Sequence, residues 1–315
     1  MTNLRSVEQE FANADLAAVT SLLAQLTDED VMTRFSLEAR LEELTQTVQE
    51  LGPSAAYTPA SAALFFGGRP VIGSRGIESE FGGSAITVFQ DLVAKVMAHD
   101  AGGLGQRGVV PNKSASTLHI TNILRGSFGF YMEEVQSQQP LFGTPPLKMA
   151  IAQTSRLLDA FGDVDEEQFQ TAVEAIDERV LNTARDFFEL MRENGATLRL
   201  VAGDSDKSFG LTEVIRAADR AISTKVEETV EVIRGQLRGV LPDAHQFEFR
   251  IHDAEGTIHG KVDQVYSVEQ LIQFNRELVN VNSSAKVLVK RVRRSGATAR
   301  ESFTILTLEP DDNAK

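Results

Sequence analysis

Apolar and polar residues alternate through the last third of the chain, and this alternation predicts β-strands. Within residues 246–252, Phe247 and Phe249 point to one face of a strand, while the charged residues beside them point to the other. A turn containing Gly256 leads to a second alternating segment at residues 257–262. The two segments are therefore expected to form a β-hairpin.

Three further strands are expected around this hairpin, at residues 230–241, 285–292 and 302–308. Ser267 and Gln270 have the spacing of a capping box, which predicts that a helix begins there. The order strand, strand, strand, helix, strand, strand is typical of a small closed β-barrel of the OB type, with the helix across one end. A fold of this type binds other molecules more often than it catalyses a reaction.

The N-terminal region has a helical pattern instead. Residues 4–26 are a helix candidate, and Thr27 followed by acidic residues predicts the start of a second helix. Apolar residues recur in the second helix at spacings of three and four, at Leu37, Leu41, Leu44, Val48 and Leu51. This short heptad seam has two interpretations, an intramolecular helical hairpin or an oligomer interface. A segment from Gly52 to Pro59 reads as a linker.

The region between the linker and the barrel is expected to be one α+β domain. Short strands at residues 62–66 and 70–73 are expected to pair with each other, and a hairpin is expected at residues 117–135. Helices are expected at residues 84–99, 146–161, 165–193 and 211–223, with one strand at 197–201. The predicted fold class is therefore α+β, with a helical hairpin (1–52), a central α+β domain (60–225) and a small β-barrel (226–309). The strands and helices do not alternate regularly, which argues against a doubly wound nucleotide-binding sheet.

Composition is that of an ordinary globular protein, with 42% hydrophobic and 24% charged residues. Because the chain has no cysteine, disulfides and thiolate chemistry are excluded. No long apolar run and no N-terminal signal pattern is recognised, so we expect a cytoplasmic protein without membrane contacts. The sequence gives no reason to expect a cofactor.

Charge is distributed unevenly along the chain. The net charge is −14; residues 1–228 contain 19 Lys+Arg and 33 Asp+Glu, whereas residues 229–309 contain 11 and 10. Six cations gather on the last hairpin of the barrel, at Lys286, Lys290, Arg291, Arg293, Arg294 and Arg300. They are candidates for phosphate contacts with a nucleic acid. Alternatively, they protect exposed strand edges or contact acidic residues of the same chain.

A glycine-rich segment is the candidate ligand site. Glycines allow backbone N–H groups to approach an anion, and a helix start expected at Ser84 would add a partial positive charge. The candidate residues are Arg69, Ser74, Arg75, Gly82, Gly83 and Ser84. Their spacing matches neither the P-loop nor the dinucleotide-binding fingerprint, and turns between short strands are the alternative explanation.

No catalytic or metal-binding motif is recognised, since the five histidines lack metal-ligand spacings. Three hypotheses about function follow. The first is a non-enzymatic binding or scaffold protein that contacts a protein partner or its own copies. The second is a nucleic-acid-associated component of a bacterial defence or regulatory assembly that uses the basic hairpin. The third is a sensor or enzyme for a small anionic ligand at the glycine-rich segment.

Overall fold

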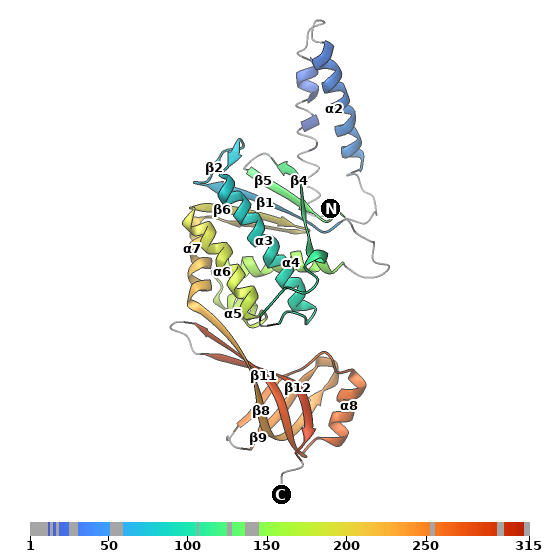
Figure 1. The fold of residues 1–315 in the computed structure, drawn as a ribbon, viewed down its shortest axis with the longest axis vertical. Helices are drawn as coiled ribbons and strands as arrows, with labels where there is room; N and C mark the ends of the chain where they lie inside the picture. The colour runs from blue at the N-terminus through green and yellow to red at the C-terminus, as the bar shows by residue number, and fades with distance from the viewer. Residues whose placement is uncertain are drawn as a thin grey trace. The chain divides into compact units, whose positions relative to one another are not determined.

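The computed structural model describes residues 12, 15–16, 19–24, 31–50, 59–105, 107–124, 128–135, 145–252, 256–294 and 299–311. The chain divides by its contacts into two compact units (Figure 1). Unit 1 consists of Met1–Ala172 and Asn182–Ala221, and unit 2 of Val173–Leu181 and Ile222–Lys315. The fold class is mixed α+β with a closed β-barrel in the C-terminal region.

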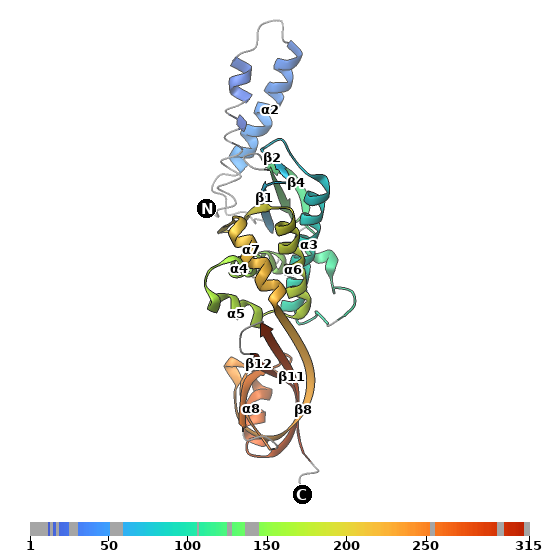
Figure 2. The ribbon, with the colours of Figure 1, turned by 90° about the vertical axis from the view of Figure 1, so that its left-hand side faces the viewer.

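The N-terminal part of unit 1 contains helix α2 (Val31–Glu50). Helical residues 19–24 lie beside α2 in both views (Figures 1 and 2). Of the seam residues, Leu44 is buried and Leu37, Leu41 and Val48 are half-buried, while Leu51 lies outside the described residues. The centre of the seam is thus shielded from solvent within a single chain.

An antiparallel five-stranded sheet forms the centre of unit 1. Its order is β4 (His119–Leu124), β5 (Phe128–Glu133), β1 (Ser61–Gly68), β6 (Ala196–Ala202) and β7 (Ser205–Phe209). β1 takes the central place because its residues 61–66, all apolar except Ser61, are buried on both faces. The expected pairing of β1 with residues 70–73 is wrong. Instead β2 (Val71–Ile72) pairs with β3 (Gly76–Ile77), and β1 pairs with β5 and β6.

Five helices accompany this sheet in the sequence: α3 (Ser79–Asp100), α4 (Pro146–Gly162), α5 (Glu166–Glu174), α6 (Glu178–Glu193) and α7 (Leu211–Ser223). Phenylalanine rings from three helices meet in the core, among them Phe161, Phe169 and Phe188. The single helix expected over residues 165–193 is wrong. The helix is interrupted because Asp177 caps α6, accepting a hydrogen bond of 2.8 Å from the Val180 N–H.

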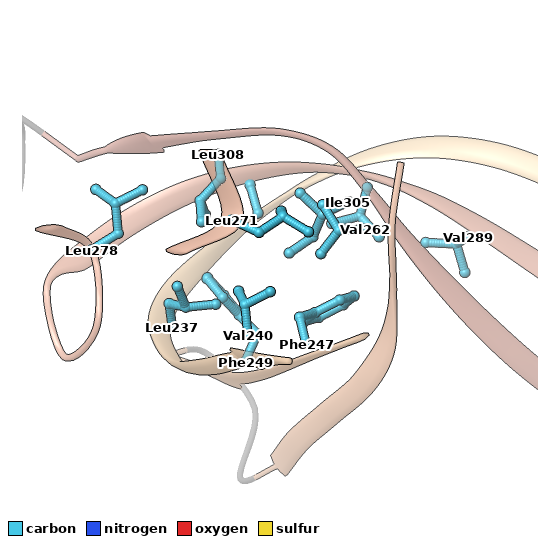
Figure 3. Close-up of a cluster of buried hydrophobic side chains, with 12 residues drawn as sticks. Leu237, Val240, Phe247, Phe249, Val262, Leu271, Leu278, Val289, Ile305 and Leu308 are labelled. Carbon is cyan, nitrogen blue, oxygen red and sulfur yellow. The ribbon is translucent and has the colours of Figure 1, made fainter. Parts of the chain in front are cut away.

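The barrel of unit 2 confirms the strand and helix order expected from the sequence. Its elements are β8 (Thr224–Leu241), β9 (Gln246–Ile251), β10 (Gly256–Val262), α8 (Val268–Glu277), β11 (Asn282–Arg294) and β12 (Arg300–Pro310). The closed order is β10-β12-β11-β8-β9, and a short parallel pairing of β10 with β12 closes it. Figure 3 shows the apolar side chains that fill the interior, including Leu237, Phe249 and Ile305. The capping box at the start of α8 is present, with Ser267 and Gln270 bonded to each other's backbone.

Two glycines allow the barrel strands to approach closely. A Cβ atom added to Gly235 would lie 2.0 Å from the Arg250 carbonyl oxygen, and one added to Gly260 would lie 2.1 Å from that of Phe303. Both distances are far below van der Waals contact, so only glycine fits.

Three of the strands continue beyond the closed barrel. β11 pairs with β8 as far as Arg294 and Thr224, whereas β9 pairs with β8 only from Gly235 onward. We call this extension, residues 224–232, 290–294 and 300–302, the arm. Along β11 the residues that face the barrel interior are apolar up to Val289 and then change to Arg291, as expected where the strand leaves the core.

Candidate functional site

The glycine-rich segment does not form a helix N-terminus at Ser84. Helix α3 begins at Ser79, so Gly82, Gly83 and Ser84 lie inside its first turns. The Gly82 N–H donates to the Glu78 carbonyl oxygen at 2.8 Å and is occupied within the helix. The expected start at Ser84 is therefore wrong, and two carboxylates, Glu78 and Glu80, stand at the actual start.

The two arginines of this segment have different surroundings. The Arg69 guanidinium donates to the Glu193 carbonyl oxygen at 2.7 Å, and its backbone N–H donates to the Gly195 carbonyl oxygen at 3.1 Å. Arg69 thus satisfies carbonyl groups at the C-terminal end of α6. Arg75 and Ser74 lie exposed in the turn between β2 and β3. The described contacts assemble no anion cradle from these residues.

The basic hairpin lies mostly on the arm, where acidic residues compensate its charge. Arg291 forms ion pairs of 2.8 Å with both Glu231 and Glu301. It also donates to the Thr229 hydroxyl at 3.0 Å. The hydrogen bonds to Glu301 and Glu231 raise the pKa of Arg291, and the hydrogen bond from Arg291 lowers the pKa of the Glu231 carboxyl. Arg291 is therefore held by three side chains of its own arm.

Lys290 is also occupied, because it is buried against the segment that joins α5 to α6. Its ammonium donates to the Glu174 carbonyl oxygen at 2.6 Å and to the Ile176 carbonyl oxygen. Burial lowers the pKa of Lys290, and the nearby carboxylates Glu228, Asp177 and Glu174 oppose this shift only in part.

The other four candidate cations differ in their partners. Arg300 forms an ion pair of 2.9 Å with Glu174, and Arg293 one of 3.8 Å with Glu227. Arg294 is half-buried beside Thr224 at the end of β8, and Lys286 is exposed. Four of the six candidates, Lys290, Arg291, Arg293 and Arg300, are thus engaged within unit 2. None of the five aromatic side chains among the described barrel residues is exposed, so no stacking surface accompanies them.

Strand edges provide a different kind of candidate site. β7 carries Asp206 and Lys207 at one edge of the central sheet, and β8, an outer strand of the arm, carries charged residues that include Lys225, Glu227, Glu228 and Glu231. β4, the outermost strand at the opposite edge of the central sheet as described, has the sequence His-Ile-Thr-Asn-Ile-Leu and carries no Asp, Glu, Lys or Arg. Its first five side chains are exposed, including Ile120 at 48% and Ile123 at 46%.

A groove of about 510 Å³ lies beside β4. Its apolar wall comes from helix α3, from β4 and from the residue before it, through Ile86, Val88, Leu118 and Ile120. Asp91, Lys113 and Asp186 are charged residues of its lining. The groove therefore combines an apolar wall with a few charged side chains, as binding sites commonly do.

Hydrogen bonds fix the walls of this groove. Asp91 binds Lys95 at 2.7 Å and Lys113 at 2.8 Å. Burial alone raises the pKa of Asp91, but the hydrogen bonds and charges of these two lysines outweigh it, and the pKa lies below its ordinary value. Gln90 accepts from the Leu118 N–H at 2.9 Å and donates to the Ser116 carbonyl oxygen at 2.6 Å, which holds the chain just before β4. The site is thus built before any partner arrives.

Sequence patterns did not reveal this groove, because the hairpin at residues 117–135 carries no sign of which strand lies at the edge. The absence of charged residues from 119 to 124 was the available signal. Comparison with protein-family models, with curated proteins and with solved structures finds no match for the chain. Among the described residues, no group of three or more metal-ligating side chains is present, and no helix is long and apolar enough to cross a membrane.

Proposed function

We propose that the protein is a non-enzymatic binding or scaffold protein that acts through protein–protein contacts. The observation that carries this proposal is the uncharged edge of β4 beside the groove. Proteins normally protect edge strands with charged residues, because an open edge pairs readily with another chain. The opposite edge of the same sheet, β7, carries Asp206 and Lys207, so the absence of charge on β4 supports a role for that edge in binding.

The nucleic-acid hypothesis ranks below this proposal. Four of the six cations of the basic hairpin are bound to acidic residues or backbone carbonyls of the same unit. Residues 1–228 contain 19 Lys+Arg and 33 Asp+Glu and thus account for the net charge of −14, which repels phosphate.

The hypothesis of a small anionic ligand at the glycine-rich segment also ranks lower. Arg69 is directed at the end of α6, and the amide group of Gly82 is occupied within α3. An anion at this place would have to compete with both interactions.

The test of the proposed function is isolation of a complex. The full-length protein is crosslinked in its source cells, purified, treated with nuclease and analysed by mass spectrometry. We expect a protein partner in fixed stoichiometry, crosslinks to the central domain, and reconstitution of the complex from two purified proteins. Association that disappears after nuclease treatment would support the nucleic-acid hypothesis instead, and recovery of the protein without any partner would contradict the proposal.

A further inference from the structure

The side chains of β4 divide into two rows, which specify the chemistry of a strand added beside it. Ile120 and Ile123 lie opposite Met132 and Phe130 of β5 and therefore share one face of the sheet. His119 lies opposite Glu133 on the other face. Thr121 is the extra residue where the register shifts. An added strand would continue the apolar row on one face and the polar row on the other.

From this arrangement we infer that the edge of β4 binds an extended segment of a basic partner protein, in which apolar residues alternate with lysine or arginine. The inference rests on the proposed function and specifies its site and partner. The apolar residues of the segment lie next to Ile120 and Ile123, above the wall formed by Ile86. Its backbone forms hydrogen bonds along the outer edge of β4, where no described strand pairs.

Charge selects the basic residues of the partner. Lys95 and Lys113 both bind Asp91, whereas Glu133, on the same face as His119, has no ion pair with another described residue. Asp186 lines the groove with Ile120 and Met132 and therefore lies on the face of the apolar row. An added strand would lie two strand spacings from β5, about 9–10 Å, which is within the screening length of roughly 10 Å at moderate salt. The net charge of −14 attracts a basic partner from further away.

A second copy of this chain fits the edge less well. Its β4 would supply isoleucines but no lysine or arginine, and it would bring its own Asp186, Glu133 and net negative charge to the contact. A like-charged partner is repelled where a basic one is attracted. Self-association through β4 is therefore an outcome that the experiment must detect.

The probe is a nine-residue peptide in which lysine and valine alternate, labelled for fluorescence anisotropy and titrated into the full-length protein. We expect a dissociation constant on the order of 100 µM at low salt. The same peptide with glutamate in place of lysine should bind at least about tenfold more weakly. Glu133→Lys should reduce this preference for lysine. Equal binding of the two peptides would overturn the inferred charge selection.

Backbone methylation tests strand pairing directly. The N–H groups of successive residues in a strand point to opposite edges. In one methylated peptide the modified amides therefore face β4, and in the other they face solvent. We expect one methylated peptide to lose at least about tenfold in affinity and the other to stay within about twofold. An equal effect in both peptides, or an effect in neither, would overturn edge pairing.

Protein variants locate the site. Ile120→Lys, and separately Ile123→Lys, places a charge on the edge and should weaken peptide binding at least about tenfold. The matched control is Ile72→Lys, because Ile72 is an exposed isoleucine on the β2–β3 hairpin of the same unit. Its binding should stay within about twofold of the unchanged protein.

Two further results distinguish failure of the edge interaction at β4 from failure of the proposed binding function. If the stoichiometric partner of the proposed function is retained by Ile120→Lys, the protein binds partners but not at β4. If sedimentation shows a dimer that Ile120→Lys dissociates, the occupant of the edge is a second copy, and the inference of a basic partner is wrong.

Discussion

The compensated charge of the arm makes a quantitative prediction about nucleic acid. If all six hairpin cations contacted phosphates of a single strand, the logarithm of the binding constant would fall with the logarithm of salt concentration at a slope of about −4. Binding would then weaken by about 300-fold between roughly 50 and 200 mM salt. With at least four of the cations engaged in the protein, at most two phosphate contacts remain, so the slope would be no steeper than about −1.4 and the loss no more than about sevenfold.

The perturbation is Glu231→Gln combined with Glu301→Gln, which removes both carboxylates from Arg291. A labelled single strand of about 20 nucleotides is titrated over a range of salt concentrations. For the unchanged protein we expect either no measurable binding or a slope no steeper than about −1.5; the variant should steepen any slope by about 0.7, the contribution of one added phosphate contact. Glu248→Gln with Glu309→Gln, which removes two exposed carboxylates outside the arm, controls for the change in net charge.

A slope near −4 with micromolar binding by the unchanged protein would refute the reasoning, because all six cations would then be available to phosphate. An equal increase in binding by the control and the arm variant would also refute it. The effect would then come from total charge rather than from release of Arg291.

Three further predictions concern stability, measured by urea denaturation of the full chain followed by circular dichroism. Arg220 is buried and binds three carbonyl groups at the C-terminal end of α4 and the carboxylate of Glu166. Arg220→Met should therefore cost about 3–5 kcal/mol of unfolding free energy, against less than about 1 kcal/mol for the exposed pair lost in Arg199→Met. Gly260→Ala should lower the unfolding free energy by about 3 kcal/mol. Gly256→Ala, where an added Cβ atom meets nothing within 4 Å, should lower it by less than about 1 kcal/mol. Equal losses of unfolding free energy in the two variants would contradict the close approach of the strands at Gly260. Leu44→Lys should destabilise the helical hairpin without a change in sedimentation coefficient, and dissociation of a folded oligomer would show that the seam lies between subunits.

The barrel could be predicted from sequence because its signals are local. The alternation around Phe249 and the capping box at Ser267 each depend on a few neighbouring residues. The central sheet depends instead on pairing between distant segments. β1 pairs with β6, more than 100 residues away, and such pairings leave no trace in a short window of sequence. β7 was not predicted, because its residues Ser-Asp-Lys-Ser-Phe resemble a loop.

The basic hairpin shows why a charge pattern alone does not reveal which partners the charges have. The strand expected from the sequence begins at residue 230, so the acidic residues Glu227 and Glu228 lie outside that strand. In the structure β8 begins at Thr224 and places them opposite Arg291 and Lys290 of β11, some 60 positions later in the chain. The pairing of β8 with β11 therefore places acidic residues beside the cluster of basic residues, and the charge of the arm is compensated.

The proposed edge interaction is weak by itself, so a partner that binds more tightly must provide further contacts. A strand added along the six residues of β4 gains about six hydrogen bonds at about 1 kcal/mol each and buries two apolar side chains at about 2 kcal/mol each. Subtraction of an association cost of about 5 kcal/mol leaves about 5 kcal/mol, which corresponds to a dissociation constant in the range of 100–300 µM. An isolated peptide should therefore bind only at this level. A partner that binds in the micromolar range must add a second contact or several copies of the segment, because linked contacts raise affinity without any change at β4.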